Sequence, residues 1–327
     1  MGKLETTYLG LTLKNPIVVA SSGLTNSVKK IKALEEAGAG AVVLKSLFEE
    51  QINGEVTHLL SGDPQNSYPE AEDYIQNYTR SHSLAAHLDL LKAAREEVSI
   101  PIIASVNCIS AREWIDFAIK LQENGADALE LNLFFVPTTK DESSETIEQL
   151  YVDALKKVKK AVSIPVSVKI GFYFTNLIAF CNKLKANGAD AVILFNRFYE
   201  PDINLDKMQI VASEVFSTPL DIRRSLRWTG LVSASLPLLE IAASTGIHDG
   251  EAVLKQLLAG AQVTQICSTV YINGNQVIGQ IIQYLEEFMD KWNFKAVENF
   301  RGRLNYSRVG DPMLYERSQF MKYFSTK

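Results

Sequence analysis

The sequence predicts an α/β fold, a (β/α)8 or TIM barrel with long loops over the carboxyl-terminal face of its strands. A Gly-Ala dipeptide precedes four short runs rich in Val, Ile and Leu, and these dipeptides begin at residues 38, 125, 188 and 260. A helical pattern ends just before each glycine, where glycine in the left-handed conformation commonly stops a helix. The apolar runs have the length and composition of strands buried on both faces, as in a parallel sheet.

A second repeated string supports this organisation. Ser-Ile-Pro occurs at 99–101 and again at 163–165, each time before another apolar run. Proline at the first residue of a strand removes no hydrogen bond from the sheet. The spacing between the two prolines nearly equals that between Gly125 and Gly188, and it corresponds to two βα units.

The chain therefore contains eight predicted strands, most of them separated by helical patterns. They cover residues 16–20, 41–45, 101–106, 127–132, 165–169, 190–195, 239–244 and 262–267. Alternating strands and helices imply a parallel sheet with right-handed crossovers, and eight such units close into a barrel. The alternative is an open, doubly wound sheet. That fold normally carries G-x-G-x-x-G after its first strand, where this chain has Ser21-Ser22-Gly23-Leu24.

We expect one domain over residues 1–327, because barrels of this length commonly form a single domain. From about residue 285 to 327 the chain is polar and aromatic, and we interpret this part as a surface extension or an oligomer contact. The segments 46–84 and 196–225 are too long for minimal loops. Both leave the carboxyl ends of strands, where long loops usually carry function.

Composition excludes several classes of protein. The 327 residues are 46% hydrophobic and 22% charged, with a net charge of −5 and no basic stripe, which argues against nucleic-acid binding. Cys108, Cys181 and Cys267 form no C-x-x-C pair, so we expect reduced thiols and no zinc or iron–sulfur site. The amino terminus lacks the apolar core of a signal peptide, and no apolar run reaches the ~18–20 residues of a membrane span. We expect a cytoplasmic protein that acts on a small molecule without a membrane or a metal.

Polar residues stand at the carboxyl end of every predicted strand, and in a barrel these ends share one site. The tips contain Ala20, Ser21 and Gly23; Lys45 and Ser46; Ser105 and Asn107; Glu130 and Asn132; Lys169; Asn196 and Arg197; Ser244, Thr245 and Gly246; and Cys267, Ser268 and Thr269. A lone asparagine is more often a turn former and a lone lysine more often solvated. Eight polar tips together favour a ligand site. A buried ammonium needs a partner, and we expect an anionic ligand to supply it to Lys45 and Lys169.

The last two tips indicate a phosphate site. Thr245-Gly246 and Ser268-Thr269 each lead into a predicted helix, and backbone N–H groups at helix starts bind phosphate. His248 either assists there or is a solvated cap. The amides of Asn132 and Asn196 can read the edge of a flat heterocycle, and the lysines can stabilise negative charge on a reduced flavin. These residue types favour FMN, but alone they also allow a sugar phosphate.

Several strings together resemble the dihydroorotate dehydrogenases. They are YLGLTLKNPIVVASSG at 8–23, LKS at 44–46, ELNL at 130–133, VSVKI at 166–170 and the STG…LLAGA…ICST segment at 244–269. The resemblance runs in order through most of residues 5–275, and that family is a (β/α)8 barrel that binds FMN at its strand tips.

The resemblance implies roles for individual residues. Ala20, Ser21, Gly23, Lys45 and Ser46 would lie along the flavin, and Asn107 would also belong to the cofactor site. Asn132, Lys169 and Asn196 would contact the flavin ring, its ribityl chain or the substrate. Thr245, Gly246, Ser268 and Thr269 would hold the phosphate. Asn77 resembles the family's first substrate-binding asparagine, and the family leads us to expect a homodimer.

The chain also departs from the family pattern. The family follows ELN-L with Ser-Cys-Pro-Asn, and its catalytic base is a cysteine or serine of this region, whereas Phe135 fills the cysteine position here. Phenylalanine transfers no proton, so the base stays unknown; Thr138, Thr139 or Lys140 are candidate substitutes. The segment between Gly230 and the strand at 239–244 is too short for the family's helix, and Ser105 stands where asparagine is common. We interpret the chain as a divergent, dihydroorotate dehydrogenase-like branch.

The leading hypothesis is an FMN oxidoreductase that transfers hydride between a small flat polar substrate, dihydroorotate/orotate or a related compound, and flavin, as in pyrimidine biosynthesis. A different substrate of the same chemistry is nearly as well supported, because the usual base is replaced. A flavin-free lyase or aldolase with Lys169 as a Schiff-base amine is a second alternative. A non-catalytic flavin binder is a third.

Overall fold

A computed structural model describes residues 2–48, 69–107, 111–198 and 200–316, except for the side chains of residues 48, 69–82 and 111–113. Eight parallel strands close into a barrel in the order β4-β3-β13-β12-β9-β8-β7-β6, and β4 pairs with β6 to complete the ring. The strands are β3 Ile17–Val19, β4 Ala41–Val43, β6 Ile102–Asn107, β7 Ala128–Asn132, β8 Val166–Ile170, β9 Ala191–Leu194, β12 Glu240–Ser244 and β13 Val263–Ile266. Each coincides with one predicted strand, so the predicted (β/α)8 barrel is confirmed.

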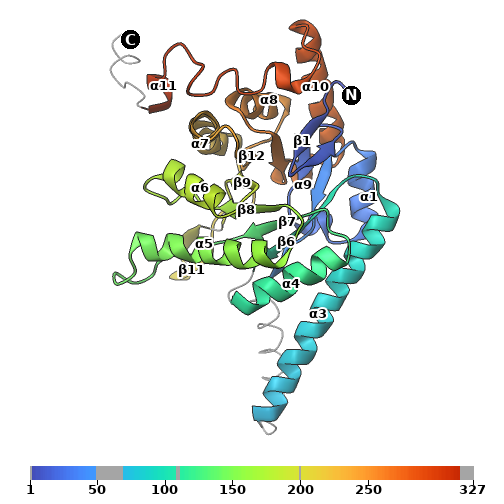
Figure 1. Ribbon diagram of the computed structural model, residues 1–327, viewed down its shortest axis with the longest axis vertical. Coiled ribbons are helices and arrows are strands. Elements are labelled where there is room, and N and C mark those ends of the chain that lie inside the picture. Colours follow the sequence, from blue (N-terminus) through green and yellow to red (C-terminus); the bar gives the residue numbers. More distant parts are fainter. Residues whose placement is uncertain (1, 49–68, 108–110, 199, 317–327) are drawn as a thin grey trace.

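Helices surround this barrel (Figure 1). The longer ones are α1 Val28–Glu36, α3 Pro69–Glu97, α4 Ala111–Glu123, α5 Ser144–Ala161, α6 Leu177–Ala186, α7 Ile222–Ser235, α8 Gly250–Ala259 and α10 Gln276–Lys291. Shorter helical turns are η1 Gly23–Thr25, η2 Pro219–Asp221, α9 Ser268–Asn273, η3 Val297–Asn299 and α11 Met313–Glu316. Among the described residues, none of these helices is both long and apolar enough to cross a membrane.

The four repeat glycines have the predicted helix-stopping conformation. Gly38, Gly125, Gly188 and Gly260 have φ values of 107°, 91°, 101° and 117°, which side chains rarely tolerate. Each follows the last turn of a helix and precedes the start of a strand. The repeat seen in the sequence is therefore the junction at which each helix turns back into the barrel.

The inside of the barrel is apolar at one end and polar at the other. A hairpin of β1 Thr6–Tyr8 and β2 Leu11–Leu13 closes the amino-terminal end, where Tyr8 and Leu9 pack against inward-facing residues such as Val18 and Ile103. Toward the carboxyl ends of the strands, the buried side chains are polar: Ser105, Glu130, Asn132, Lys169 and Gln265. Hydrocarbon therefore fills one end of the barrel, and hydrogen-bonding groups gather at the end that carries the long loops.

Both segments expected as long loops contain regular structure. The first holds β5 Leu47–Phe48 and the start of α3 at Pro69. The second holds an antiparallel hairpin of β10 Pro201–Asn204 and β11 Gln209–Ala212, followed by η2 and the start of α7. The expectation that no full helix precedes the strand at 239–244 was wrong. Helix α7 begins upstream at Ile222 and runs through Gly230, and this glycine lies against the ring of Tyr315.

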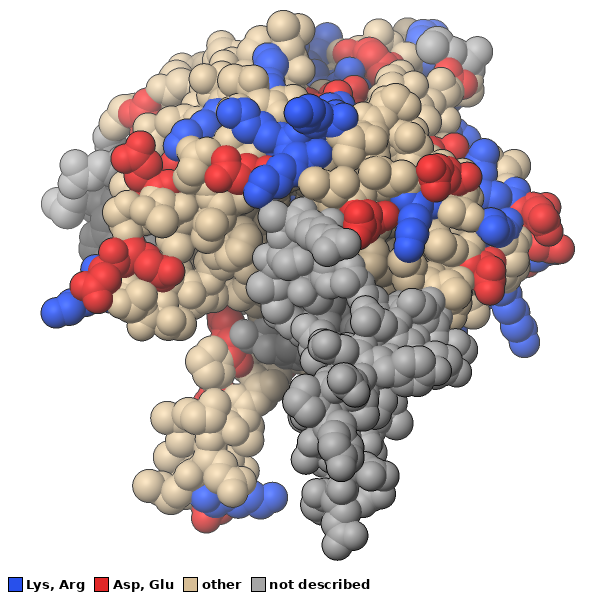
Figure 2. Space-filling model, turned by 60° about the horizontal axis from the view of Figure 1, so that its bottom comes forward, with Lys and Arg blue, Asp and Glu red and all other residues tan. Residues whose placement is uncertain are grey.

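The carboxyl-terminal segment packs onto the barrel helices. Val297 and Phe300 are fully buried, and the N–H groups of Gly302 and Leu304 donate to carbonyl oxygens of α8. On the face shown in Figure 2, lysines and arginines lie interspersed with aspartates and glutamates, as the sequence suggested.

Candidate functional site

A buried lysine lies at the polar end of the barrel. Lys169, on β8, is 6% exposed, and its Nζ donates to Oε1 of Gln265 at 2.9 Å. The same Nζ lies 3.4 Å from Oε1 of Glu130, and the amide of Gln265 donates to the other carboxylate oxygen at 2.5 Å. The sequence argument that an anionic ligand must supply the partner of Lys169 was therefore wrong, because Glu130 of β7 supplies it.

Two asparagines adjoin this lysine. Asn132 is the register partner of Lys169 in the β7–β8 pair, and Asn196, just after β9, donates its side-chain N–H to Oδ1 of Asn132. The ends of three successive strands thus bring together one ammonium and two amides, as the strand-tip argument predicted. Together they present donors and acceptors from a rigid part of the fold.

A chain of serine hydroxyls joins the tips on the other side of the barrel. The N–H of Ser46 donates to Oγ of Ser21 at 2.8 Å, and Oγ of Ser46 lies 2.7 Å from Oγ of Ser105. Ser105, which replaces a common asparagine, is thus a hydrogen-bonding partner of Ser46. Lys45 and Asn107 are half-buried at the same end, and the N–H of Ala20 donates to the carbonyl oxygen of Ile266 in β13.

The predicted phosphate residues meet a serine that the sequence argument missed. Oγ of Ser217 accepts from the N–H of Gly246 at 3.4 Å and lies 3.1 Å from Oγ of Ser268. It also lies 3.0 Å from Nε2 of His248, so this histidine is not a solvated cap. The string Ser-Thr-Pro-Leu-Asp at 217–221 is a helix-start signal, and recognising it would have placed Ser217 beside α7.

The two predicted threonines use their hydroxyls within the fold. Thr245, at φ 75°, donates to the carbonyl oxygen of Phe195 at 3.0 Å, and Thr269 donates to that of His248 at 2.8 Å. Gly246 leaves no room for a side chain, because a Cβ there would lie 2.0 Å from the backbone N of Ile222. Gly23 similarly lies against the hydroxyl of Tyr271 in α9. Burial lowers the pKa of His248.

Four of the predicted site residues are not found in a buried site among the described residues. Asn77 belongs to the backbone of α3, but its side chain lies outside the described residues. Thr138, Thr139 and Lys140 are exposed, and the N–H of Asp141 donates to the hydroxyl of Thr139. The catalytic base therefore stays unassigned.

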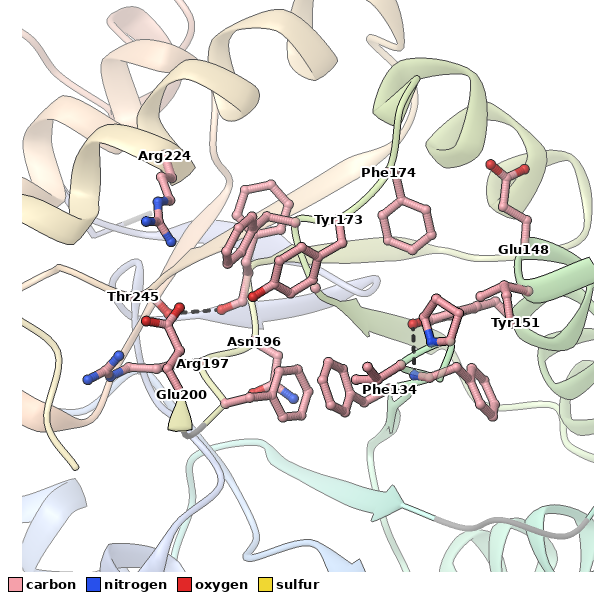
Figure 3. Close-up of a pocket in the computed structure, with 18 of the residues that line it drawn as sticks. Phe134, Glu148, Tyr151, Tyr173, Phe174, Asn196, Arg197, Glu200, Arg224 and Thr245 are labelled. Carbon is pink, nitrogen blue, oxygen red and sulfur yellow. Dashed lines mark hydrogen bonds between the residues drawn. The ribbon is translucent and has the colours of Figure 1, made fainter. Parts of the chain in front are cut away.

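A cavity of about 640 Å³ opens beside Asn196 (Figure 3). Its walls come from the loops after β7, β8 and β9, from the start of α5 and from the start of α7. Eight of the described residues that line it are aromatic: Phe134, Phe135, Tyr151, Phe172, Tyr173, Phe174, Phe195 and Phe198. Only Phe135 was singled out from the sequence. The aromatic pair at 134–135 and the aromatic triplet at 172–174 each come shortly after a strand. This position in the sequence could have indicated an aromatic site at the strand tips.

Contacts fix several of these rings. The N–H of Phe135 donates to the hydroxyl of Tyr151 at 3.3 Å, and the two rings meet edge to face at 5.0 Å. Burial raises the pKa of Tyr151 to about 12, so its hydroxyl stays protonated. The guanidinium of Arg224 lies 4.6 Å from the ring centre of Phe172. Among the described residues there is no cluster of three side chains suited to hold a metal ion.

Comparison with known proteins agrees with these features. A family model described as dihydroorotate dehydrogenase matches residues 3–289. The chain is 29% identical over 310 residues to dihydroorotate dehydrogenase B (NAD(+)), catalytic subunit, of Thermoplasma volcanium, covering 92% of this chain and 98% of that protein. It is 26% identical to the protein of the same name from Methanocaldococcus jannaschii, over 90% and 96% of the two chains. It is 25% identical to a putative dihydroorotate dehydrogenase A (fumarate) of Aeropyrum pernix, over 92% and 97%.

Proposed function

Because the chain belongs to the dihydroorotate dehydrogenase family, we propose that its strand tips bind FMN and that a small flat substrate exchanges hydride with the flavin there. The chain is a dihydroorotate dehydrogenase-like oxidoreductase; the cofactor, the substrate and the residue roles are the proposal. One observation carries it. Lys169 is a buried cation whose strand neighbours present the amides of Asn132 and Asn196 at the same end of the barrel.

The residues present fit this cofactor. Asn132, Lys169 and Asn196 would face the ring, and the lysine would stabilise negative charge on its reduced form. Ser21, Lys45, Ser46 and Asn107 would lie along the remainder of the site. Gly246, Ser217 and Ser268 already form one polar group at the starts of helices, where backbone N–H groups favour phosphate. Bound FMN supplies the hydride acceptor.

The pairing of Lys169 argues against the aldolase alternative. A Schiff-base lysine attacks as a free amine, whereas Nζ of Lys169 donates to Gln265 and lies 3.4 Å from a carboxylate oxygen of Glu130. Phe135 leaves proton removal without an assigned residue, so a related dihydropyrimidine is nearly as strong a candidate as dihydroorotate.

An absorbance spectrum followed by anaerobic titration tests the proposal. We expect visible flavin bands in the purified protein, and bleaching of these bands by dihydroorotate or by another dihydropyrimidine. A colourless protein that takes up no added FMN contradicts flavin binding. A yellow protein that no such compound reduces contradicts the proposed reaction and favours a flavin binder without activity.

Names of the relatives suggest how electrons leave the enzyme. Two of the relatives are named catalytic subunits with NAD(+), and one is named with fumarate. We propose that a homodimer of this chain works in the cytoplasm, in pyrimidine biosynthesis. Light scattering tests the dimer, and reoxidation of the reduced protein by NAD⁺ or by fumarate identifies the acceptor.

A further inference from the structure

We propose that the aromatic cavity binds a ring carried by the substrate, so that the enzyme acts on a larger, aryl-bearing relative of a dihydropyrimidine. This inference rests on the proposed function and names its substrate class. Pockets of about 300–1,000 Å³ enclose ligands of drug size, and this cavity has about 640 Å³. Of the residues assigned to the flavin, only Asn196 and Thr245 line this cavity, so most of its wall lies outside the flavin site. Dihydroorotate, a single six-membered ring with one carboxylate, is small compared with the space that remains.

Aromatic rings line much of the cavity wall. Phe134 stacks on Phe198 with an angle of 18° between the rings, and Phe172 lies against Tyr173 with 4.1 Å between ring centres. Figure 3 shows the rings of Phe134, Tyr151, Tyr173 and Phe174 around this cavity, with Asn196 beside them. Aromatic rings prefer stacked or edge-to-face neighbours, and the lining contains both kinds of pair, Phe134–Phe198 stacked and Phe135–Tyr151 edge to face.

Tyr173 is the most informative of these rings. It is 67% exposed, although it lies within a cluster of aromatic side chains. Such an exposed ring adds little to the packing of the fold, whereas a ligand ring that covered it would bury apolar area. Ligand pockets are lined predominantly by apolar and aromatic side chains, and Tyr173 is one of the lining residues.

Several charged side chains of the cavity are engaged with neighbouring groups. Nη2 of Arg197 donates to the carbonyl oxygens of Glu214 and Phe216 at 2.6 and 3.0 Å, and Glu148 lies 3.5 Å from Nζ of Lys183. Arg224 covers the ring of Phe172 and so extends the flat surface. Recognition in this cavity therefore depends mainly on apolar and aromatic contact.

The cavity adjoins the proposed reaction site at Asn196. Asn196 lines the cavity and also donates to Asn132, the register partner of Lys169. A heterocycle held by the two amides can therefore extend a substituent between the rings. Phe135 belongs to the same wall, so the replacement that removes the family's usual base also adds apolar surface for this substituent.

Paired ligands test the inference on the holoenzyme. Calorimetry measures Kd for uracil and for 5-benzyluracil, which share the heterocycle and differ by one aryl group. We expect 5-benzyluracil to bind at least tenfold more tightly, which is about 1.4 kcal/mol. In the Tyr173→Ala and Phe134→Ala proteins, the ratio falls toward one while the Kd of uracil stays within twofold. Trp292→Ala, which removes a 60% exposed ring on another part of the surface, leaves both values unchanged.

Two results overturn the inference. The first is equal affinity for the two ligands, and the second is a preference that neither Tyr173→Ala nor Phe134→Ala reduces. Tyr173 is too exposed for its removal to threaten folding, so this variant keeps the test decisive if Phe134→Ala is unstable. Calorimetry needs no flavin signal, so a colourless protein contradicts the proposed function, while the ratio of the two Kd values still tests the aryl preference separately.

Discussion

Lys169 and Glu130 form an ion pair that is nearly closed to solvent, with exposed side-chain fractions of 8% and 1%. Removing one partner of such a pair leaves the other charge buried without compensation. Lys169→Met is expected to lower the free energy of unfolding by about 3–5 kcal/mol. The double variant Lys169→Met/Glu130→Gln removes both charges and is expected to recover most of this loss. Urea denaturation measures all three proteins.

The same pair of variants separates stability from chemistry. If Lys169 contacts the cofactor, the stable double variant still reduces its flavin far more slowly than the wild-type protein. A double variant that is stable and reduces flavin at the wild-type rate shows that Lys169 takes no part in the reaction.

Gly246 provides a second residue-scale prediction, and Gly10 is its control. Both have positive φ, 78° and 69°. A Cβ at Gly246 would lie 2.0 Å from the backbone N of Ile222, whereas nothing lies within 4 Å of one at Gly10. Gly10→Ala is expected to cost about 1 kcal/mol from backbone strain alone. Gly246→Ala adds the clash and is expected to cost clearly more; equal thermal unfolding midpoints would contradict this.

Individual site residues were predicted only as far as chain position determines them. Lys169, Asn132 and Asn196 could be grouped because each follows a predicted strand, and parallel strands end on one face. The partner of Lys169 could not be assigned, since it depends on which side chains of β7 and β13 point inward at the same level. Ser217 was missed for a similar reason: its contacts with Gly246, His248 and Ser268 join segments far apart in sequence.

At the scale of elements, the strands were predictable and two helices were not fully so. The repeat glycines mark where strands begin, and burial on both faces makes those strands uniformly apolar. The sequence placed the start of helix α3 too far along the chain. The buried apolar positions among its described side chains begin only at Leu84. Helix α7 carries Gly230 in its interior, and an interior glycine lowers helix propensity. The first residues of this helix, from Ile222, were therefore predicted to belong to the preceding loop.

Helix α3 carries a histidine that makes stability depend on pH. Nε2 of His87 is buried and has no hydrogen-bond partner among the described residues, and burial lowers the pKa of this side chain to about 4. An unfolded histidine has a pKa near 6.5, so between pH 6.5 and about 4 the unfolded chain binds a proton that the folded chain does not. Stability therefore falls as pH falls through this window, and above pH 6.5 this histidine contributes no slope.

Replacing His87 tests that dependence. Between pH 7 and pH 4.5, His87→Leu is expected to lose less unfolding free energy than the wild-type protein, by roughly 2 kcal/mol. The comparison uses urea midpoints of both proteins at each pH, because contributions from other titrating groups then cancel. Parallel stability curves for the two proteins would show that His87 is as accessible to protons in the folded state as in the unfolded chain.

At the scale of the whole molecule, the barrel separates stability from function along its axis. Tyr8 and Leu9 seal one end with hydrocarbon, and the polar groups of the other end are held by strands that pack on both faces. Length and repeat predicted this architecture, since eight equivalent units have few other ways to bury their strands. The side chains that line the cavity were not predictable, because their positions depend on how three loops fold over one another.

Ligand binding at the polar end should stabilise the whole barrel. A ligand that binds only the folded state adds about 2.7 kcal/mol at a free concentration of 100 times its Kd. For protein stripped of flavin, we therefore expect FMN to raise the thermal unfolding midpoint by several degrees. Riboflavin, which lacks the phosphate, is expected to raise it clearly less at equal concentration, because Gly246, Ser217 and Ser268 then have no phosphate to bind. Ser268→Ala should narrow the difference between the two ligands, whereas Ser163→Ala, on the far side of the strands from the loops, should not. Equal shifts by FMN and riboflavin would place the phosphate away from these residues.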